Sequence, residues 1–123
     1  MSYWTGLTYE TGWGDYGNGY ESGQCKLDGD RVFLRGSIGY SGTNPFSVPI
    51  QIASLPSGFA PPAVEIFAAV FLQPSGLGQG GSLIYIKIDT SGAISWVQQE
   101  SGSQSVGTNQ FICLDGISFS ILS

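Results

Sequence analysis

The sequence predicts an all-β domain, an antiparallel sandwich or barrel, and three observations support this prediction. The chain has 19 glycines in 123 residues, and each glycine inside a helix would cost about 1 kcal/mol relative to alanine. Several short stretches alternate apolar and polar residues, which is the period of a half-buried strand. Turn signals separate about seven such stretches at a spacing of roughly ten residues, as in sandwiches and barrels.

Size and charge narrow the possible functions. A length of 123 residues fits one domain with a conventional core. The net charge is −5, and the four basic residues are scattered along the sequence at Lys26, Arg31, Arg35 and Lys87. Without a basic stripe, binding to nucleic acid or to an anionic membrane surface is not expected. The chain has no histidine, which removes Ser-His-Asp and Cys-His catalysis and the HExxH zinc site.

The two cysteines, Cys25 and Cys113, are too few for a disulfide scaffold and lack metal-ligand spacing. Two interpretations remain: each is a small buried hydrophobic residue, which we favour, or the two form a disulfide. No leader pattern and no apolar run of about 18 residues is present, so we expect a soluble domain without membrane insertion.

The first third of the chain begins with an expected extended entry arm, residues 1–10, and the domain itself is expected to span residues 11–123. An aromatic loop follows the arm, with Trp13, Tyr16 and Tyr20 among glycines. Gln24–Leu27 is a short strand, and residues 28–30 (Asp-Gly-Asp) supply a hairpin turn. Arg31–Ile38 then alternates as one half-buried antiparallel strand.

The middle of the chain contains the most apolar stretch. Phe46–Ile52 is expected to be a strand, in which Pro49 requires an edge or bulged position because proline donates no ladder hydrogen bond. Ala63–Leu72 is interrupted only by Glu65. We expect this strand either to be covered on both faces or to lie in a subunit interface.

The last third is expected to contain a hairpin and a closing strand. Leu83–Ile88 and Ala93–Gln98 alternate on either side of an Asp-Thr-Ser-Gly turn at residues 89–92. Phe111–Ile121 closes the domain, and Asp115-Gly116 within it is either a turn or a bulge in one long strand. The stretches 39–45, 55–62, 73–82 and 99–110 are loops by composition.

Five motifs occur in a fixed order: GWGDYGNGY, KLDGDRVFLRGSI, IASLPSGFAPP, IKIDTSGAISW and CLDGISFSIL. This series resembles the C-terminal head domain of bacteriophage tail fibres and minor tail proteins, where GWxNYGxGY precedes a K.GD.V.LRG.I segment and a terminal LDGI.F. The resemblance covers about Leu7 to Ile121. The chain departs from the pattern at Asp15, at Cys25 and at residues 59–60, and family binding residues near those positions are in doubt.

The resemblance implies a jelly-roll-like β-sandwich that forms a homotrimer at the tip of a fibre and binds a host cell-surface saccharide. It also implies a fibre shaft at the N-terminal side, with Tyr3 and Trp4 at the junction or at a threefold axis. Such heads occur at virion tail fibre tips and on extracellular contractile injection particles. The residues expected to define the fold within these motifs are Trp13, Tyr16, Tyr20, Gly36, Asp115 and Gly116.

Catalysis is the least favoured function. Glu10, Asp15 and Glu21 lie near the aromatic loop, and a pair of carboxylates is the usual machinery for glycan hydrolysis. We expect solvated or turn-capping roles for them, and likewise for Asp28, Asp30 and Asp89. The sequence therefore predicts no enzyme, no cofactor and no metal site.

Recognition is expected in the polar loops, because amide side chains both donate and accept hydrogen bonds, as sugar hydroxyls do. The candidate ligand-binding residues are Tyr40, Asn44, Gln73, Gln79, Gln98, Gln99, Gln104 and Asn109. The sequence thus predicts a receptor-binding head. The alternatives are a structural trimerisation cap that binds no receptor and, less favoured, a glycan-cleaving enzyme.

Overall fold

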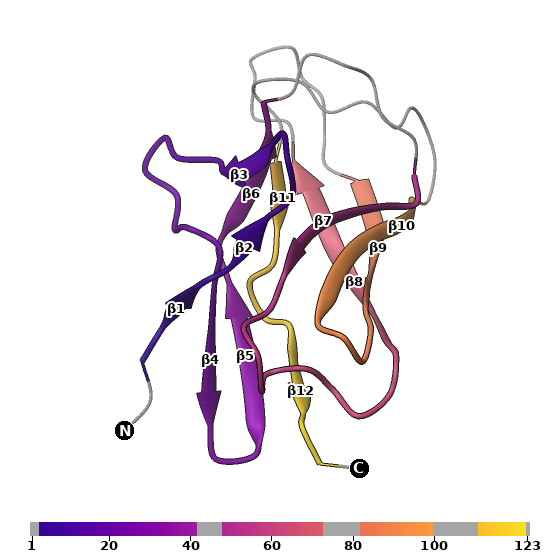
Figure 1. The fold of residues 1–123 in the computed structure, drawn as a ribbon. Helices are drawn as coiled ribbons and strands as arrows, with labels where there is room; N and C mark the ends of the chain where they lie inside the picture. The colour runs from indigo at the N-terminus through magenta and orange to yellow at the C-terminus, as the bar shows by residue number, and fades with distance from the viewer. Residues whose placement is uncertain (1–2, 42–47, 73–81, 100–110, 123) are drawn as a thin grey trace.

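The computed structural model describes residues 3–41, 48–72, 82–99 and 111–122, and every regular element within these ranges is a β-strand (Figure 1). All strand pairs are antiparallel. The strands form two sheets that wrap around a common core, so the predicted all-β antiparallel fold is confirmed. No described segment forms a helix that is long and apolar enough to span a membrane.

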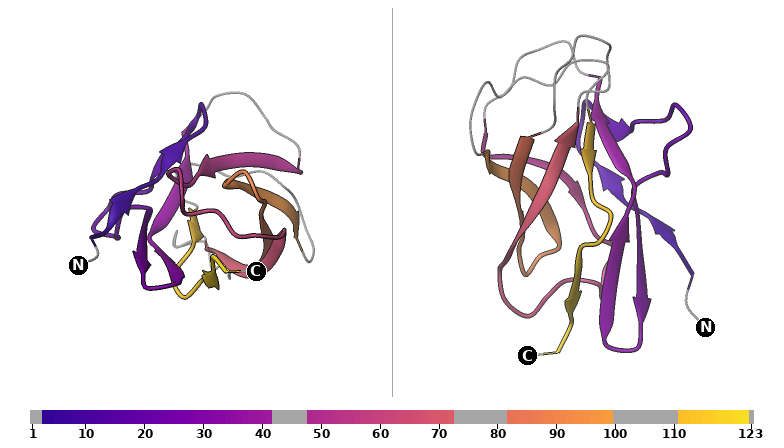
Figure 2. Two further views of the ribbon diagram at one scale, coloured as in Figure 1. Left: turned by 60° about the horizontal axis from the view of Figure 1, so that its bottom comes forward. Right: turned by 180° about the vertical axis from the view of Figure 1, so that it is seen from behind.

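Within the described residues, sheet A has four strands and sheet B has eight. In spatial order, sheet A contains β1 (Thr5–Gly6), β4 (Gln24–Asp28), β5 (Arg31–Arg35) and β12 (Ser118–Ser120). Sheet B contains β2 (Thr8–Tyr9), β7 (Ile50–Ser54), β10 (Ala93–Gln99), β9 (Ser82–Ile88), β8 (Glu65–Leu72), β11 (Phe111–Cys113), β6 (Ser37–Tyr40) and β3 (Trp13–Asp15). Viewed from its lower end, the larger sheet curls round and the smaller sheet closes one side (Figure 2).

The core lies between the two sheets and takes alternate residues from nearly every strand. Its largest fully buried side chains include Trp96 and Phe119, together with a set of isoleucines from sheet B. These isoleucines are Ile38, Ile52, Ile84, Ile86, Ile88, Ile94 and Ile112. β-branched side chains suit such positions because they pack well on a pleated surface.

The two predicted hairpins are confirmed. Asp28 pairs with Arg31, which leaves Gly29 and Asp30 as a two-residue loop, and Gly29 has φ +63°. In the β9–β10 hairpin the Asp89 carboxylate accepts hydrogen bonds from the backbone N–H groups of Ser91 (3.0 Å) and Ala93 (3.3 Å). The Ser91 hydroxyl donates a third hydrogen bond to the same carboxylate. This third bond is the main cause of the lowered pKa of Asp89, and the two backbone bonds lower it further. Asp89 is therefore a turn residue, as predicted.

The single strand predicted over Arg31–Ile38 is wrong, because the chain changes sheet at Gly36. β5 belongs to sheet A and β6 to sheet B. Gly36 has φ +110°, and a Cβ there would lie 2.0 Å from the backbone oxygen of Ser22. Only glycine can make this sharp crossing, since both the conformation and the space exclude a side chain.

The closing strand also changes sheet. β11 pairs in sheet B and β12 in sheet A, and Asp115-Gly116 is the turn between them. Of the two predicted alternatives the turn is correct, and the single long strand is wrong. The two crossings meet, because the Leu114 N–H donates to the Gly36 carbonyl at 2.9 Å and the Leu34 N–H donates to the Ile117 carbonyl at 2.9 Å.

The strand predicted from Phe46 begins later. β7 starts at Ile50, after a cis Val48–Pro49 peptide bond. Residues 46–47 lie outside the described residues. Pro49 therefore precedes the strand, and the predicted edge or bulge position within a strand is wrong.

Both cysteines are unbonded, so the disulfide interpretation is wrong. Cys25 is fully buried beneath sheet A, and its Sγ lies 3.6 Å from the Thr5 carbonyl oxygen. It is the small buried hydrophobic residue that the sequence favoured. Cys113 is only partly buried.

The apolar strand β8 is covered on one face only. Phe67, Ala69 and Phe71 face the core, whereas Ile66 and Val70 are 56% and 40% exposed. Val70 pairs with Leu83 of β9, which is also exposed. The expectation that this strand is covered on both faces is therefore wrong for a single chain. We name this surface, formed by Ile66, Ala68, Val70 and Leu83, the apolar face.

Candidate functional site

The ends of several strands of sheet B meet at one end of the molecule. Leu72, the last residue of β8, pairs with Phe111, the first of β11. Ser82 at the start of β9 pairs with Phe71, and Gln99 at the end of β10 pairs with Ile84. The chain therefore leaves sheet B for the stretches 73–81 and 100–110 from the same end (Figure 1).

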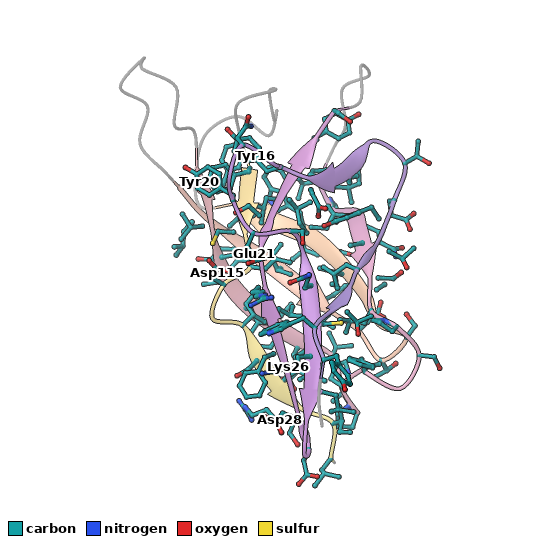
Figure 3. All side chains as sticks on the ribbon, turned by 90° about the vertical axis from the view of Figure 1, so that its left-hand side faces the viewer. Tyr16, Tyr20, Glu21, Lys26, Asp28 and Asp115 are labelled. Atoms are coloured by element: carbon teal, nitrogen blue, oxygen red, sulfur yellow. The ribbon has the colours of Figure 1, made fainter. Side chains whose placement is uncertain are left out.

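Aromatic side chains gather at this end, and we call Trp13, Tyr16, Tyr20, Tyr40 and Phe111 the aromatic end. Trp13 of β3 pairs with Tyr40 of β6, with ring centroids 4.9 Å apart. Tyr16 stacks on Phe111 at 4.4 Å, and Tyr20 packs on the same ring at 4.8 Å. Figure 3 shows Tyr16 and Tyr20 next to one another at this end of the molecule. Phe111 is only 1% exposed, whereas Tyr20 is 47% exposed.

The glycines of this segment explain how the two tyrosines reach one ring. Gly17, Asn18 and Gly19 all have positive φ, at 77°, 57° and 88°. The turn closes with a hydrogen bond from the Tyr20 N–H to the Gly17 carbonyl at 3.0 Å. Three consecutive left-handed residues reverse the chain tightly, which glycine and asparagine tolerate best.

A shallow pocket of about 130 Å³ lies at the edge of sheet B, beside these rings. We call it the edge pocket; its lining residues are Gly14, Asp15, Tyr16, Gly39, Tyr40 and Ser41. Gly14 and Gly39 pair directly across β3 and β6. Because both are glycines, this part of the pocket wall is bare backbone. A Cβ added at Gly14 would meet no atom within 4 Å. The space equals about four water molecules.

Asp15 is held in place by the neighbouring chain. Its Oδ1 accepts a short hydrogen bond from the Tyr9 hydroxyl and a 3.0 Å bond from the Gly23 N–H. Burial, and then the Asp15 carboxylate, raise the pKa of Tyr9 well above its ordinary value, so this phenol stays protonated and donating. Asp15 therefore presents a fixed acceptor at the edge of the pocket.

The other carboxylates near the aromatic loop make separate contacts. Glu21 Oε1 lies 4.0 Å from the Arg35 guanidinium, and both side chains are solvent-accessible. The backbone carbonyl of Glu10 accepts a 2.9 Å hydrogen bond from the Trp13 N–H. Among the described residues, no group of three or more acidic or cysteine side chains is arranged to hold a metal ion.

The structure brings one predicted ligand-binding residue, Tyr40, into the edge pocket. Gln98 and Gln99 belong to the end of β10. The remaining candidates, Asn44, Gln73, Gln79, Gln104 and Asn109, lie outside the described residues. Sequence reasoning missed Gly14, Gly39 and Ser41 as lining residues. The GYS run at residues 39–41 is a weak signal, and only the β3–β6 register reveals the pocket.

The predicted fold-defining residues occupy two places. Trp13, Tyr16 and Tyr20 form most of the aromatic end, while Gly36, Asp115 and Gly116 lie where the two strands cross between sheets. The Asp115 carboxylate accepts a hydrogen bond from the Gly36 N–H at 2.8 Å. These contacts give both groups of residues packing or hydrogen-bonding roles within the domain.

Comparison with protein-family models and with curated protein sequences finds no match. A solved structure does match: the crystal structure of the receptor binding protein (gp15) of Listeria phage PSA, with a TM-score of 0.66 and 20% sequence identity. The match covers 97% of this chain and 64% of that chain. This chain is thus similar to about two-thirds of a longer protein. At this identity the likeness establishes the fold: almost the whole chain folds like part of a phage receptor binding protein.

Proposed function

We propose that this chain is the receptor-binding head of a phage tail fibre, or of the fibre of a related contractile injection particle. The observation that carries this proposal is the structural likeness to a phage receptor binding protein over 97% of the chain. In this proposal the domain sits at the tip of the fibre, on the virion or on an extracellular injection particle. We place the aromatic end outward, away from the fibre shaft.

The ligand that the edge pocket suits best is a saccharide. Tyr16 and Tyr40 supply aromatic surface on which the apolar face of a sugar ring packs. The Asp15 carboxylate accepts hydrogen bonds, and the Ser41 hydroxyl both donates and accepts them. This combination of aromatic surface and polar groups fits a ring with hydroxyls on its rim.

A homotrimer would supply the avidity that a shallow single site lacks. Three copies on one head, and several fibres on a particle, raise apparent affinity by about 10²- to 10⁴-fold when the geometry permits simultaneous binding. The apolar face supports this assembly, because its apolar side chains lie next to one another on two paired strands and are exposed in the single chain. Contiguous exposed apolar surface of this kind is typical of an interface between subunits.

We further propose that the domain binds without catalysis. Asp15, the carboxylate in the edge pocket, is already bonded to Tyr9 and Gly23. Glycoside hydrolysis ordinarily requires two carboxyl groups facing one bond. The glycan-cleaving alternative predicts new reducing ends in host polysaccharide and their loss in Glu10→Ala, Asp15→Ala or Glu21→Ala variants.

The deciding experiment measures adsorption of the fluorescently labelled domain to a panel of bacterial cells, together with binding to a glycan array. We expect saturable adsorption to particular strains, and competition by a saccharide from those strains. Absence of binding to every surface would instead favour the trimerisation cap. Competition by protein but not by saccharide would contradict the saccharide assignment alone.

A further inference from the structure

The outer face of sheet A carries charged and aromatic side chains that the aromatic end does not use. Strands β4 and β5 alternate, so that Cys25, Val32 and Leu34 are buried. The opposite face carries Lys26, Asp28, Arg31, Phe33 and Arg35. Three of the four basic residues of the chain therefore lie on two paired strands.

Trp4 lies over this face. The Arg35 guanidinium carbon is 3.9 Å from the centroid of the Trp4 ring, and the Lys26 ammonium is 4.9 Å from it. The Arg35 Nε donates to the Gln24 side-chain oxygen at 2.8 Å, which fixes the guanidinium beneath the ring. Cation–π attraction thus holds Trp4 against the sheet.

A pocket of about 440 Å³ opens between Trp4, the β4–β5 strands and the turn before β12. We call it the sheet A pocket. Its lining includes Trp4, Lys26, Asp28, Phe33, Gly116 and Ser118. Its volume falls within the range of small-molecule sites, about 300–1,000 Å³. Gly116 contributes no side chain, and a Cβ there would meet nothing within 4 Å.

The two charged groups that line this pocket, Lys26 and Asp28, do not form an ion pair with each other. Among the described residues, the carboxylate within 4.0 Å of a cation is Glu21 beside Arg35, and not Asp28 beside Lys26. Lys26 and Asp28 are two residues apart on β4, which separates their Cα atoms by about 7 Å. Figure 3 shows them one after the other along the strand. The pocket thus presents a donor and an acceptor of equal and opposite charge.

A ligand that contacts both groups has to offer an acceptor to Lys26 and a donor to Asp28. A carboxylate or phosphate would be attracted by Lys26 and repelled by Asp28. A cation would be attracted by Asp28 and repelled by Lys26. Hydroxyl groups accept from the ammonium and donate to the carboxylate. Phe33, which is partly exposed in the pocket, offers an apolar surface for the carbon face of a ring.

We propose that the sheet A pocket is a second saccharide site, which takes a neutral pyranose with hydroxyls on Lys26 and Asp28 and its carbon face against Phe33. The proposal shares the ligand class of the proposed function but concerns a separate surface, since Figure 3 shows Lys26 and Asp28 far along the molecule from Tyr16 and Tyr20. Ser118, the cross-strand neighbour of Phe33 on β12, also lines the pocket, and its hydroxyl oxygen accepts a hydrogen bond from Arg31 Nε at 3.2 Å.

The test is a nuclear magnetic resonance titration of the ¹⁵N-labelled chain with methyl α-glucopyranoside, methyl α-galactopyranoside or N-acetylglucosamine. The reporter is the indole N–H signal of Trp4, assigned by its loss in Trp4→Phe. We expect at least one sugar to shift this signal with saturation in the millimolar range. Lys26→Met and Asp28→Ala should each weaken binding about tenfold, because each removes a charged hydrogen-bonding partner.

The matched control is Lys87→Met, which removes the only other lysine, on β9 of sheet B, and should leave the affinity unchanged. Dispersed spectra of each variant will show that it is folded. The proposal is overturned if none of the three sugars shifts the Trp4 signal at tens of millimolar, or if Lys26→Met binds as well as the wild type. It is also overturned if glucose 6-phosphate binds more than about tenfold tighter than glucose, because the pocket is then an anion site.

A protein occupant would give a different result. If the Trp4 signal moves with protein concentration in the absence of sugar, a second copy covers the pocket and the saccharide proposal is wrong. Failure of these titrations leaves cell adsorption through the aromatic end unaffected. Conversely, a titration that succeeds while adsorption to all cells is absent contradicts the proposed receptor-binding role and not this site.

Discussion

The Asp115 carboxylate accepts a 2.8 Å hydrogen bond from the backbone N–H of Gly36 and so joins the two points at which the chain crosses between sheets. The residues are 79 positions apart in the sequence. Beside this bond, the Gly36 carbonyl accepts from the Leu114 N–H at 2.9 Å. Gly36 therefore has both backbone groups bonded to the closing segment, which couples the two sheets.

Replacing Gly36 with alanine should destabilise the domain severely, because the new Cβ would lie 2.0 Å from the Ser22 carbonyl oxygen and φ is +110°. We expect a loss of more than about 3 kcal/mol in the free energy of unfolding, measured with urea. Gly29→Ala is the control: φ is +63° and no atom lies within 4 Å of the added Cβ, so its cost should be about 1–2 kcal/mol. Equal losses would contradict the role of the close approach.

Removing the Asp115 carboxylate tests the hydrogen bond itself. Asp115→Ala leaves the Gly36 N–H without this acceptor and should cost about 1–2 kcal/mol in urea unfolding. Asp115→Asn retains an oxygen that can accept the same bond and should cost less than the alanine variant. An asparagine variant as unstable as the alanine variant would show that the negative charge, rather than the hydrogen bond, matters.

The domain should lose stability in alkali. Burial raises the pKa of Cys25 from 9.0 to about 11, and the pKa of Tyr9 is also raised. Above pH 9 the unfolded chain therefore releases protons that the folded chain retains. The free energy of unfolding has its full value below pH 9 and declines as the pH rises towards 11. For Cys25 alone the free energy of unfolding should fall by about 2 kcal/mol between pH 8 and pH 10.5.

Urea unfolding at each pH measures this decline, and Cys25→Ala should flatten it relative to the wild type. Cys113→Ala is the comparison variant, since Cys113 is only partly buried. A wild-type stability that does not change up to pH 10.5 would contradict the burial of the Cys25 thiol.

A charge on the apolar face should prevent the proposed assembly. Ile66 is 56% exposed in the single chain, so Ile66→Asp should fold, but burying its carboxylate between subunits would be costly. We expect a trimer for the wild type and a monomer for this variant by sedimentation equilibrium at micromolar concentration. Leu122→Asp, at an equally exposed position away from the apolar face, should remain a trimer. A monomeric wild type would refute the assembly outright.

A side chain at Gly14 should block the edge pocket without unfolding the domain. A Cβ there meets nothing within 4 Å, and β-branched residues suit strands, so Gly14→Val should keep the stability of the wild type. Its adsorption to host cells should fall at least tenfold. Gly6→Val is the matched control, because Gly6 also lies in a strand with no atom within 4 Å of an added Cβ, but in sheet A. Unchanged adsorption by Gly14→Val would remove the edge pocket from receptor binding.

The local parts of the fold could be predicted from the sequence. The β4–β5 and β9–β10 hairpins follow from Asp-Gly and Ser-Gly turns between alternating stretches. The change of sheet was predicted at neither Gly36 nor Asp115-Gly116, although a turn at Asp115-Gly116 was one of two predicted alternatives. Apolar alternation continues through Gly36, and local sequence does not say which sheet a strand joins. The decisive facts are long-range: the distance from Gly36 to Ser22 and the bond to Asp115.

The candidate sites were less predictable for the same reason. Tyr40 was predicted as a ligand-binding residue, but its partners across the edge pocket depend on the register of β3 against β6. Local sequence does not encode the pairing of Gly14 with Gly39, which are 25 residues apart. Likewise, the four basic residues look scattered in the sequence. Three of them nevertheless lie on one face of sheet A, because the β4–β5 hairpin brings them together.

The position of residues 111–120 has a consequence for how the protein is made. β11 lies between β6 and β8 in sheet B, and β12 continues from it to pair with β5 in sheet A. Until this segment leaves the ribosome, β6 and β8 lack their shared neighbour, and the core lacks Ile112, Leu114 and Phe119. In the nascent chain β5, β6 and β8 therefore each lack one partner, and both sheets are completed only when this late segment arrives.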